Sequence, residues 1–287
     1  MSFFVNENAS LATYSSMKAG GNAKYLVFPK SVTELVDAVG FYREQGEKII
    51  VVGNCSNLIF PDEGFDGAVI CTTSLRGVSV ENKIITANCG ETLSTLARFA
   101  CENSLSGLEF CYGIPGTVGG GVYMNAGAYG GQLSDRFIDA TFIDENLNII
   151  TLALNEMEFG YRRSRMQSQN LVLLSARFSG VDGDKNEIKS KMDELMASRK
   201  AKQPLEFPSC GSAFKRPEGH FAGALIEQCG LKGYSIGGAQ VSEKHAGFII
   251  NRNNATATDV IRLMESVKDI VLENTGILLE PEIRVIK

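Results

Sequence analysis

The stretch Gly113-Ile-Pro-Gly-Thr-Val-Gly-Gly-Gly-Val-Tyr-Met-Asn-Ala-Gly-Ala-Tyr-Gly-Gly131 holds eight glycines within nineteen residues. Glycine is used this densely where backbone must approach a neighbour closely or adopt a positive φ, because it has no Cβ. Exposed amide N–H groups in such a loop can form a concave nest for phosphate oxygens. The residues between the glycines are largely apolar, unlike those of a flexible linker. The stretch predicts a rigid, half-buried loop that binds a nucleotide or dinucleotide cofactor; the alternative is a glycine-rich turn system inside a sheet.

The composition of the whole chain narrows the class of protein. Its 287 residues suit two or three lobes. The net charge of −5 argues against a nucleic-acid surface, which usually shows a basic excess. The N-terminal residues lack the basic and apolar regions of a signal peptide, and no apolar run is long enough to span a membrane. We therefore expect a soluble, cytoplasmic protein without nucleic-acid or membrane partners.

The cysteines agree with a reducing compartment. They are odd in number, scattered, and never spaced as Cys-x-x-Cys, so we expect free thiols. The seven positions are Cys55, Cys71, Cys89, Cys101, Cys111, Cys210 and Cys229.

Apolar periodicity predicts mixed helices and strands without a regular β-α-β rhythm, which favours an α+β fold. A capping box at Ser31-Val-Thr-Glu34 begins a helix that ends at Gly46. Further helices are expected over Thr92–Asn103, Lys185–Lys202, Phe221–Cys229 and Thr258–Asn274. Strands are expected over Lys48–Val52, Ala68–Cys71, Ile84–Asn88, Leu171–Phe178, Ser235–Gln240, Gly247–Ile250 and Ile277–Ile286, with a hairpin over Ile138–Leu152. We place a lobe boundary near residues 185–205.

Several familiar cofactor and catalytic motifs are missing. The chain has neither the Rossmann pattern Gly-x-Gly-x-x-Gly after a strand nor a P-loop, and it has no nucleophile elbow. Only His220 and His245 could supply imidazole ligands, and we interpret both as structural, so no metal site is expected. A cofactor must then occupy a cradle that Gly53–Asn57 and Gly113–Gly131 build together. Two such loops suit the two ends of a large ligand such as a flavin dinucleotide.

Three further clusters carry candidate chemistry. In Phe159-Gly-Tyr-Arg-Arg-Ser164, an arginine can bind a carboxylate through two hydrogen bonds, although a solvated turn is the alternative. Ser212 lies on a turn beside two cations in Pro208-Ser-Cys-Gly-Ser-Ala-Phe-Lys-Arg-Pro217, where a plain loop is the alternative. On the expected terminal strand, alternation puts Glu280, Glu282 and Arg284 on one face, as a functional group or as a salt-bridged edge.

Taken in order, these segments closely resemble the family of UDP-N-acetylenolpyruvoylglucosamine reductases. The resemblance covers nearly the whole chain, and the ordered set is highly specific although each motif alone is weak. The matching motifs are Gly53-Asn-Cys-Ser-Asn-Leu-Ile-Phe-Pro-Asp-Glu-Gly-Phe-Asp-Gly67, the stretch from Gly113 to Gly131, Phe159-Gly-Tyr-Arg162, Gly211-Ser-Ala-Phe-Lys-Arg-Pro217 and the terminal Glu-Pro-Glu-Ile-Arg.

The resemblance implies an FAD-binding lobe of the vanillyl-alcohol-oxidase type and a C-terminal substrate lobe. It divides the chain into one FAD subdomain over residues 1–75, a second over 76–185, and a substrate lobe over 186–287. The implied reaction is the NADPH-driven, FAD-dependent reduction of UDP-N-acetylglucosamine enolpyruvate to UDP-N-acetylmuramate in peptidoglycan synthesis. The chain resembles the short second type of the enzyme, and we expect a monomer with non-covalent FAD.

The resemblance also implies roles for individual residues. The implied catalytic residues are Arg162, Ser212 and Glu282. The implied FAD-binding residues are Gly53, Asn54, Cys55, Ser56, Asn57, Leu58, Pro115, Gly116, Thr117, Gly119, Gly120, Ala126, Gly127 and Arg284. The implied substrate-binding residues are Tyr129, Arg162, Lys202 and Arg216.

Two motifs depart from the usual family pattern. The flavin loop more often reads Gly-Gly-Gly-Ser-Asn, and here Asn54 and Cys55 replace two glycines. Asparagine tolerates the left-handed region, whereas Cys55 must hold a conformation compatible with a Cβ. Arg216 stands where the first type of the enzyme tends to have asparagine, so its implied contact with a diphosphate depends on charge.

The chemistry of the residues agrees with the resemblance. Arg162, with Glu282 opposite, would stabilise the charge that builds on an enolpyruvyl carboxylate as hydride adds to C3. Ser212 would then protonate C2, helped by Lys215 or the local backbone. The rival enzyme is an FAD oxidase or dehydrogenase of the same superfamily, disfavoured because no histidine stands in the glycine-rich loops to attach flavin. A nucleotide-binding regulatory module is the rival without catalysis.

Overall fold

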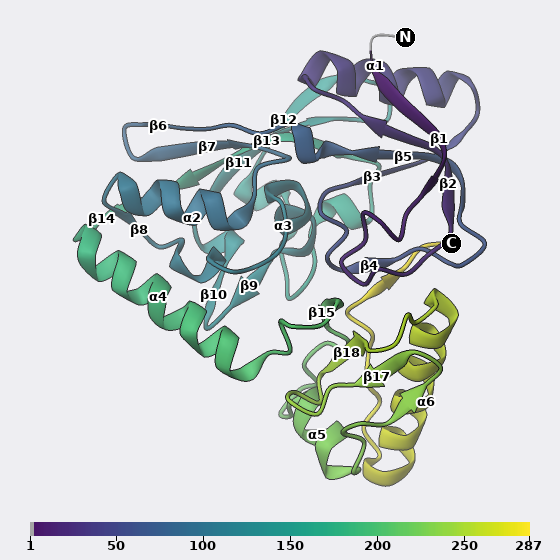
Figure 1. The fold of residues 1–287 in the computed structure, drawn as a ribbon. Helices are drawn as coiled ribbons and strands as arrows, with labels where there is room; N and C mark the ends of the chain where they lie inside the picture. Colours follow the sequence, from purple (N-terminus) through teal and green to yellow (C-terminus); the bar gives the residue numbers. More distant parts are fainter. Residues whose placement is uncertain (1–2) are drawn as a thin grey trace. The chain divides into compact units, whose positions relative to one another are not determined.

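Two compact units make up the chain in the computed structural model, which describes residues 3–287 (Figure 1). The first unit comprises Leu26–Asn54, Gly67–Arg199 and the described residues before Glu7. The second comprises Glu7–Tyr25, Cys55–Asp66 and Lys200–Lys287. Both helices and strands occur throughout, which confirms the expected α+β class. Among residues 3–287, no helix combines the length and apolar character needed to cross a membrane.

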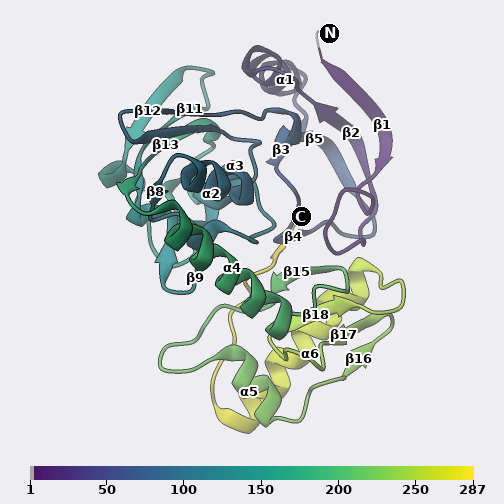
Figure 2. The same ribbon diagram turned by 60° about the vertical axis from the view of Figure 1, so that its left-hand side comes forward.

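A five-stranded antiparallel sheet of order β12-β11-β13-β7-β6 forms much of the first unit (Figure 2). The predicted hairpin is present, and the Asp144 carboxylate closes its turn by accepting the amides of Asn146 and Asn148 at 2.8 Å. The Arg43 guanidinium donates to the carbonyls of Asp144 and Glu145 at 2.9 Å, which ties the first helix to this turn. The strands are β6 (Val78–Glu81), β7 (Ile84–Asn88), β11 (Phe137–Ile143), β12 (Ile149–Ala153) and β13 (Val172–Ser179).

The remaining strands outside the C-terminal region form smaller sheets. A four-stranded sheet has the order β1-β2-β5-β3, in which β3 and β5 are parallel. Two antiparallel pairs, β8 with β14 and β9 with β10, complete the first unit. The bounds are β1 (Phe4–Ser10), β2 (Asn22–Phe28), β3 (Lys48–Val52), β5 (Phe65–Cys71), β8 (Leu105–Ser106), β9 (Gly127–Ala128), β10 (Gly131–Gln132) and β14 (Val181–Asp182).

The expected helices of the first unit are confirmed, with one change at a cap. Ser31 accepts the Glu34 amide at 3.1 Å, but the Glu34 carboxylate accepts the amide of Lys30 and not that of Ser31. The predicted reciprocal capping box is therefore wrong in its second half, because the carboxylate reaches one residue further back. The helices are α1 (Val32–Glu44), α2 (Leu93–Glu102) and α4 (Lys185–Lys202).

A short helix that the sequence did not predict, α3 (Val118–Met124), lies inside the glycine-rich stretch. Thr117 caps it by accepting the Gly120 amide at 3.3 Å, and Asn125 ends it in the left-handed conformation with φ 42°. A Cβ on Gly121 would lie 3.0 Å from the Leu93 side chain, so the glycine lets α3 pack closely against α2. Glycine's low helix propensity hides this helix in the sequence, and tertiary packing overrides it.

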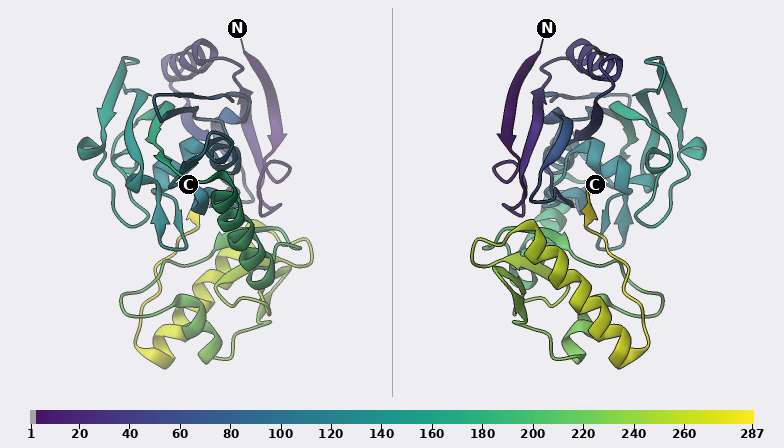
Figure 3. Two further views of the ribbon diagram at one scale, coloured as in Figure 1. Left: turned by 90° about the vertical axis from the view of Figure 1, so that its left-hand side faces the viewer. Right: turned by 90° about the vertical axis from the view of Figure 1, so that its right-hand side faces the viewer.

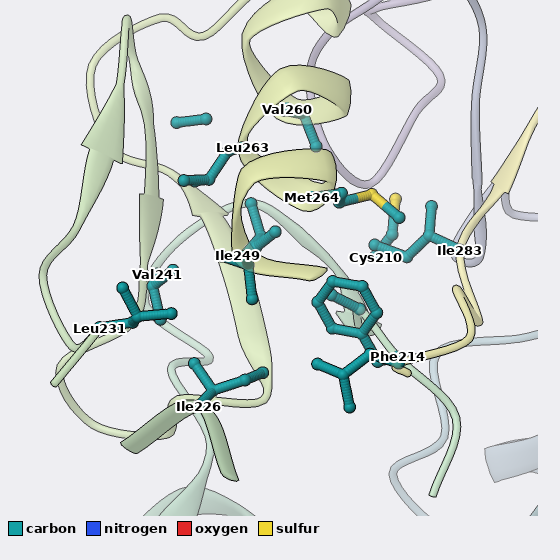
Figure 4. Close-up of a cluster of buried hydrophobic side chains, with 14 of the residues drawn as sticks. Cys210, Phe214, Ile226, Leu231, Val241, Ile249, Val260, Leu263, Met264 and Ile283 are labelled. Carbon is teal, nitrogen blue, oxygen red and sulfur yellow. The ribbon is translucent and has the colours of Figure 1, made fainter. Parts of the chain in front are cut away.

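The second unit is built on a four-stranded antiparallel sheet of order β15-β18-β17-β16 (Figure 3). Helix α6 packs against this sheet, and its predicted apolar stripe, including Val260, Leu263 and Met264, enters the core beside Ile249 and Phe214 (Figure 4). The elements are β15 (Ser209–Ser212), β16 (Ser235–Ile236), β17 (Ala239–Val241), β18 (Phe248–Asn251), α5 (Ala222–Gln228) and α6 (Ala257–Thr275).

The C-terminal strand is shorter than the sequence predicted. Only β19 (Arg284–Val285) is a strand, paired in parallel with β4 (Leu58–Ile59). Before it, Pro281 makes an isolated bridge with Phe214. The expected strand over Ile277–Ile286 is wrong in extent, because this segment bonds to two different partners in succession and Pro281 lacks an amide hydrogen.

The first turn of α6 is capped from a distant segment. The Asp62 carboxylate accepts the amides of Ala257 and Thr258 at 2.8 Å and the Thr258 hydroxyl at 2.6 Å. Thr256 accepts the next amide, that of Asp259, at 3.0 Å. The first three amides of the helix therefore have acceptors, as a stable helix start requires. These bonds join Asp62 to α6 within the second unit.

We predict that Asp62→Ala lowers the free energy of unfolding by about 1 kcal/mol, the usual cost of losing a helix cap. Asp62→Asn should retain part of the stability, because an amide oxygen still accepts, and Glu63→Ala is the matched control at an exposed neighbour. Urea unfolding of the three variants measures the effect. Equal losses for Asp62→Ala and Glu63→Ala would contradict the capping role.

The same carboxylate predicts a pH dependence. Burial raises the pKa of Asp62, but the hydrogen bonds from Thr258 and Ala257 outweigh it and hold the pKa below its ordinary value. The stabilisation should be complete above the unfolded-state pKa of about 4 and disappear as the pH falls through the folded-state pKa.

Candidate functional site

The two glycine-rich loops meet in the first unit. The Asn54 side-chain amide donates to the Pro115 carbonyl at 3.0 Å. Gly53 lies so close to the α3 cap that a Cβ on it would be 2.1 Å from Thr117 Oγ1. The predicted assembly of one cradle from both loops is therefore present for Gly53, Asn54 and the segment Pro115–Thr117.

The left-handed residue of the flavin loop is Cys55, with φ 47°, so Cys55 does not hold one of the ordinary conformations that a Cβ favours. Cys55 is buried, and its carbonyl accepts the Ser16 amide at 3.3 Å in the second unit. A non-glycine residue at positive φ is uncommon and is maintained when its surroundings fix it. The buried setting of Cys55 therefore holds a locally strained backbone.

Arg162 lies on a tight turn that packs against the glycine-rich stretch. It has φ 55°, and its Nη2 donates to the Gly127 carbonyl at 3.1 Å. Its guanidinium stacks over the Tyr161 ring at 5.0 Å. The Gln167 side chain bridges the turn to α3, because its Nε2 donates to the carbonyls of Arg162 and Tyr123 at 3.0 and 2.9 Å. Arg162 is thus fixed beside Gly127, a predicted FAD-binding residue.

Asn125 positions this turn, a role that was not predicted from the sequence. Its side chain is buried and donates to the Gly160 carbonyl at 3.1 Å and to Gln132 at 3.2 Å, while it accepts the Ser134 amide at 3.0 Å. One amide therefore joins the end of α3 to β10 and to the Arg162 turn. The sequence gives little signal for this role, because the helix that Asn125 ends is itself hidden by its glycines.

Ser212 and Glu282 come together in the second unit. The Ala213 carbonyl, next to Ser212, accepts the Glu282 amide at 2.9 Å. Gly211 has φ 76°, and the register of β15 against β18 shifts between Ser209 and Ser212. This irregularity re-aims the end of the strand, which is a common use of a bulge beside a functional group. Ser212 and Glu282 are both half-buried.

Two residues close to Ser212 in the sequence, Lys215 and Cys210, already have partners of their own. Lys215 forms an ion pair with Glu280, so the cation proposed as a helper is engaged on the chain's own carboxylate. Cys210 is buried and donates to the Leu58 carbonyl at 3.4 Å. Burial raises the pKa of Cys210 to about 12, which keeps this thiol protonated at neutral pH.

The C-terminal segment also holds the other end of the flavin loop. The Arg284 amide donates to the Asn57 carbonyl at 3.0 Å, and the Asn57 side chain donates to the Glu282 carbonyl at 3.2 Å. Leu58 pairs with Arg284 in the β4–β19 register. The structure thus brings Asn57, Leu58, Glu282 and Arg284 together.

The residues implied for substrate binding lie in different settings. Tyr129 is 47% exposed in the first unit. In the second unit, Lys202 is exposed at the end of α4, and the Arg216 guanidinium stacks over the Phe221 ring at 4.0 Å. The predicted site residues thus form two groups, each defined within its own unit. The first contains Arg162 with Gly53, Asn54, Pro115, Gly116, Thr117, Gly119, Gly120, Ala126, Gly127 and Tyr129, and the second contains Ser212 and Glu282 with Cys55, Ser56, Asn57, Leu58, Lys202, Arg216 and Arg284.

The first group fits a dinucleotide cofactor. A Cβ on Gly53 would lie 2.1 Å from Thr117 Oγ1 and one on Gly127 2.7 Å from the Gly131 carbonyl, so the close approach of these backbone segments requires glycine at both positions. A ligand can then approach the peptide groups directly. The protein can supply position and charge at such a site, and a flavin would supply the redox chemistry.

Comparison with known proteins gives the same assignment along the sequence. A family model described as FAD binding domain matches residues 23–153, and one described as the C-terminal domain of UDP-N-acetylenolpyruvoylglucosamine reductase matches residues 203–286. The UDP-N-acetylenolpyruvoylglucosamine reductase of Caldicellulosiruptor bescii is 49% identical over 278 residues, which cover 96% of this chain and 88% of that protein. The one from Streptococcus pneumoniae is 48% identical over 276 residues, which cover 96% and 92%.

Solved structures agree with this relationship. The UDP-N-acetylenolpyruvylglucosamine reductase of Thermus caldophilus superposes with a TM-score of 0.84 at 32% identity and covers all of both chains. A cholesterol oxidase from Brevibacterium sterolicum, at 15% identity, has a TM-score of 0.51 over 63% of this chain and 38% of its own, so only the fold is shared. The expected vanillyl-alcohol-oxidase type of FAD-binding lobe is confirmed. With nearly half of its residues identical to those of such enzymes over almost its whole length, the chain belongs to the UDP-N-acetylenolpyruvoylglucosamine reductase family of FAD-dependent oxidoreductases.

Proposed function

We propose that this protein reduces the enolpyruvyl group of UDP-N-acetylglucosamine enolpyruvate with electrons from NADPH, giving UDP-N-acetylmuramate for peptidoglycan. The family relationship supports the reaction. The observation that carries the residue assignment is the bond from the Glu282 amide to the Ala213 carbonyl, which holds Glu282 beside Ser212. We further propose that the protein acts in the cytoplasm as a monomer, with FAD subdomains over 1–75 and 76–185 and a substrate lobe over 186–287.

Three side chains divide the work of the reaction. FAD, when bound in the cradle and reduced by NADPH, would supply the hydride chemistry for reduction of the enolpyruvyl group at C3. The Arg162 guanidinium binds the substrate carboxylate by two hydrogen bonds and, with Glu282, stabilises the charge that develops there. The Ser212 hydroxyl donates the proton that completes the reduction at C2. The fixed Arg162 turn limits the reorganisation that this step requires.

The chain's own peptide groups would hold FAD. We assign the contacts to Gly53–Leu58, to Pro115–Thr117, Gly119, Gly120, Ala126 and Gly127, and to Arg284. Tyr129, Lys202 and Arg216 are assigned to the UDP-sugar. The close packing of Gly53 on Thr117 supports the cofactor assignment, since it brings the two glycine-rich loops together.

We predict that Gly53→Ala purifies with much less FAD, because its Cβ would lie 2.1 Å from Thr117 Oγ1 and force the two loops apart. The matched control is Gly40→Ala in α1, where a Cβ meets only the flexible end of Leu147 at 3.1 Å. The ratio of flavin to protein absorbance measures FAD content.

Acid precipitation of the unaltered protein should release the yellow flavin colour into the supernatant, because we expect FAD to be bound non-covalently. A yellow protein pellet would contradict non-covalent binding.

For Ser212→Ala, we expect FAD content and flavin bleaching by NADPH to persist while reoxidation by the enolpyruvyl substrate slows about 10²–10⁴-fold, the usual contribution of a general acid. Ser212→Cys should keep some activity, because a thiol can also deliver a proton. Stopped-flow absorbance separates the two half-reactions. Cys210→Ala is the control; an equal loss there would mean that the proton donor is misassigned.

Arg162→Lys and Glu282→Gln should impair reduction of the enolpyruvyl group more than oxidation of NADPH by the enzyme alone. Lysine keeps the charge but loses the planar fork that binds a carboxylate by two bonds. Arg163→Lys, at the exposed neighbouring arginine, and Glu273→Gln, at an exposed glutamate of α6, are the controls, and both should leave the two rates near normal. Equal losses in both half-reactions for Arg162→Lys or Glu282→Gln would instead indicate disturbed flavin binding.

A further inference from the structure

Arg199, near the end of α4, carries a buried charge without a matching partner. The residue is only 6% exposed. Among residues 3–287, no hydrogen-bond acceptor reaches its Nε or its Nη2. Every other buried side-chain nitrogen or oxygen in this range has a hydrogen-bond partner. Burial lowers the pKa of this guanidinium. An arginine nevertheless stays protonated in a protein, so its charge is retained.

The surrounding side chains hold the guanidinium in place without neutralising it. Gly113, the first glycine of the glycine-rich stretch, has φ 84°, and a Cβ on it would lie 2.9 Å from Arg199 Cδ and 3.2 Å from Nε. On another side, the guanidinium lies over the Tyr129 ring at 5.2 Å from its centroid. Met196, one turn earlier in α4, packs against the same glycine. Arg199 is therefore fixed against the glycine-rich stretch that we assign to ligand binding.

A purely structural role explains this arrangement poorly. Burying a charged group without hydrogen bonds costs several kcal/mol, and an apolar side chain of similar volume would fill the space without that penalty. An arginine near a helix C-terminus can bond the last carbonyls, but Nε and Nη2 do not. The stacking on Tyr129 offsets only part of the cost.

The two unpartnered nitrogens also have a specific geometry. Nε and Nη2 form one edge of the planar guanidinium, and their N–H bonds are parallel. This edge matches two oxygens of a carboxylate or a phosphate, which it binds by two charge-assisted hydrogen bonds. The unpartnered Nε and Nη2 of Arg199 are therefore suited to one kind of ligand group, an oxyanion that presents two oxygens side by side.

We propose that Arg199 is an oxyanion-binding residue of the active site, which takes a phosphate or carboxylate group of a diffusible ligand, the UDP-sugar or NADPH. Both ligands are anionic, and Arg199 contacts Tyr129 and Gly113 on the glycine-rich stretch. The role rests on the proposed function for the identity of the ligands, but not on the assignment of Ser212, Arg162 or Glu282. A side chain at position 113 would then displace the Arg199 guanidinium, which explains why this residue is glycine.

The test compares FAD-loaded protein with Arg199→Met and Arg199→Lys, and uses Arg98→Met as the matched control at an exposed arginine of α2. Inorganic pyrophosphate, NADP⁺ and the UDP-sugar product are titrated separately, with the melting temperature and the flavin absorbance as readouts of binding. Turnover is not needed, so a failure of the proposed reaction leaves these measurements interpretable. Michaelis constants for NADPH and the enolpyruvyl substrate follow.

We expect Arg199→Met to keep its FAD and to melt no lower than the unaltered protein without ligand, because an unpaired buried charge has been removed. Its dissociation constant for at least one anionic ligand should rise about tenfold or more, as expected when hydrogen bonds to a charged group are lost. Arg199→Lys should give an intermediate loss, since it keeps the charge without the fork. Arg98→Met should bind as before.

The pattern of losses identifies the source of the oxyanion. A change confined to the UDP-sugar or to NADP⁺ assigns it to that ligand, and a change in both with pyrophosphate assigns a shared phosphate position. Unchanged binding of all three together with a lower melting temperature would overturn the proposal in favour of a structural role. Loss of FAD from the well-folded lysine variant would also overturn it, because the oxyanion would then belong to the resident cofactor.

Discussion

The pairing of β4 with β19 is the constraint on which the second unit's functional groups depend. Two residues of the flavin loop, Leu58–Ile59, lie in parallel register with Arg284–Val285. The Asn57 side chain extends this contact to the Glu282 carbonyl, and the Glu282 amide bonds to the carbonyl of Ala213. A residue near the end of the chain is thereby held next to a strand that begins more than seventy residues earlier. The bridge between Pro281 and Phe214 adds a further contact that keeps Glu282 beside Ser212.

In the first unit, glycines hold the functional segments together, because their lack of a Cβ permits close packing. Gly53 admits Thr117, Gly121 admits Leu93, and Gly113 admits Arg199, each at a separation that a Cβ would prevent. Close-packed interiors transmit such contacts with little slack. The glycines therefore do more than loosen a loop, since they let the α3 cap, α2 and α4 converge on one stretch of chain.

Backbone strain also occurs at several of the predicted site residues and their neighbours. Cys55, Asn125, Tyr129 and Arg162 all have positive φ although none is glycine. Each costs energy that the surrounding structure must supply, and such residues concentrate at functional sites. Asn125 shows how the cost is met, because its buried side chain makes three hydrogen bonds that join α3, β10 and the Arg162 turn. The result is an arginine whose position is fixed before a ligand binds.

The sequence by itself determined the α+β class, most helices and strands, and the family, because these depend on local periodicity and on motifs in order. It also predicted that Gly53–Asn57 and Gly113–Gly131 share one cradle. It missed α3, because glycine's weak helix propensity conceals a helix that is held by packing on α2. It also overextended the last strand, since its partners, Phe214 and Leu58, are chosen by tertiary contacts.

Only the tertiary structure decided which residues act together. Lys215 pairs with Glu280, and the left-handed conformation falls on Cys55. Asn125 and Arg199 looked ordinary in the sequence, because a hydrogen-bond network and an unpaired buried charge exist only once distant segments are packed. Residue type and spacing specify which chemistry is available; burial and partners, which are properties of the folded chain, specify where it can be used.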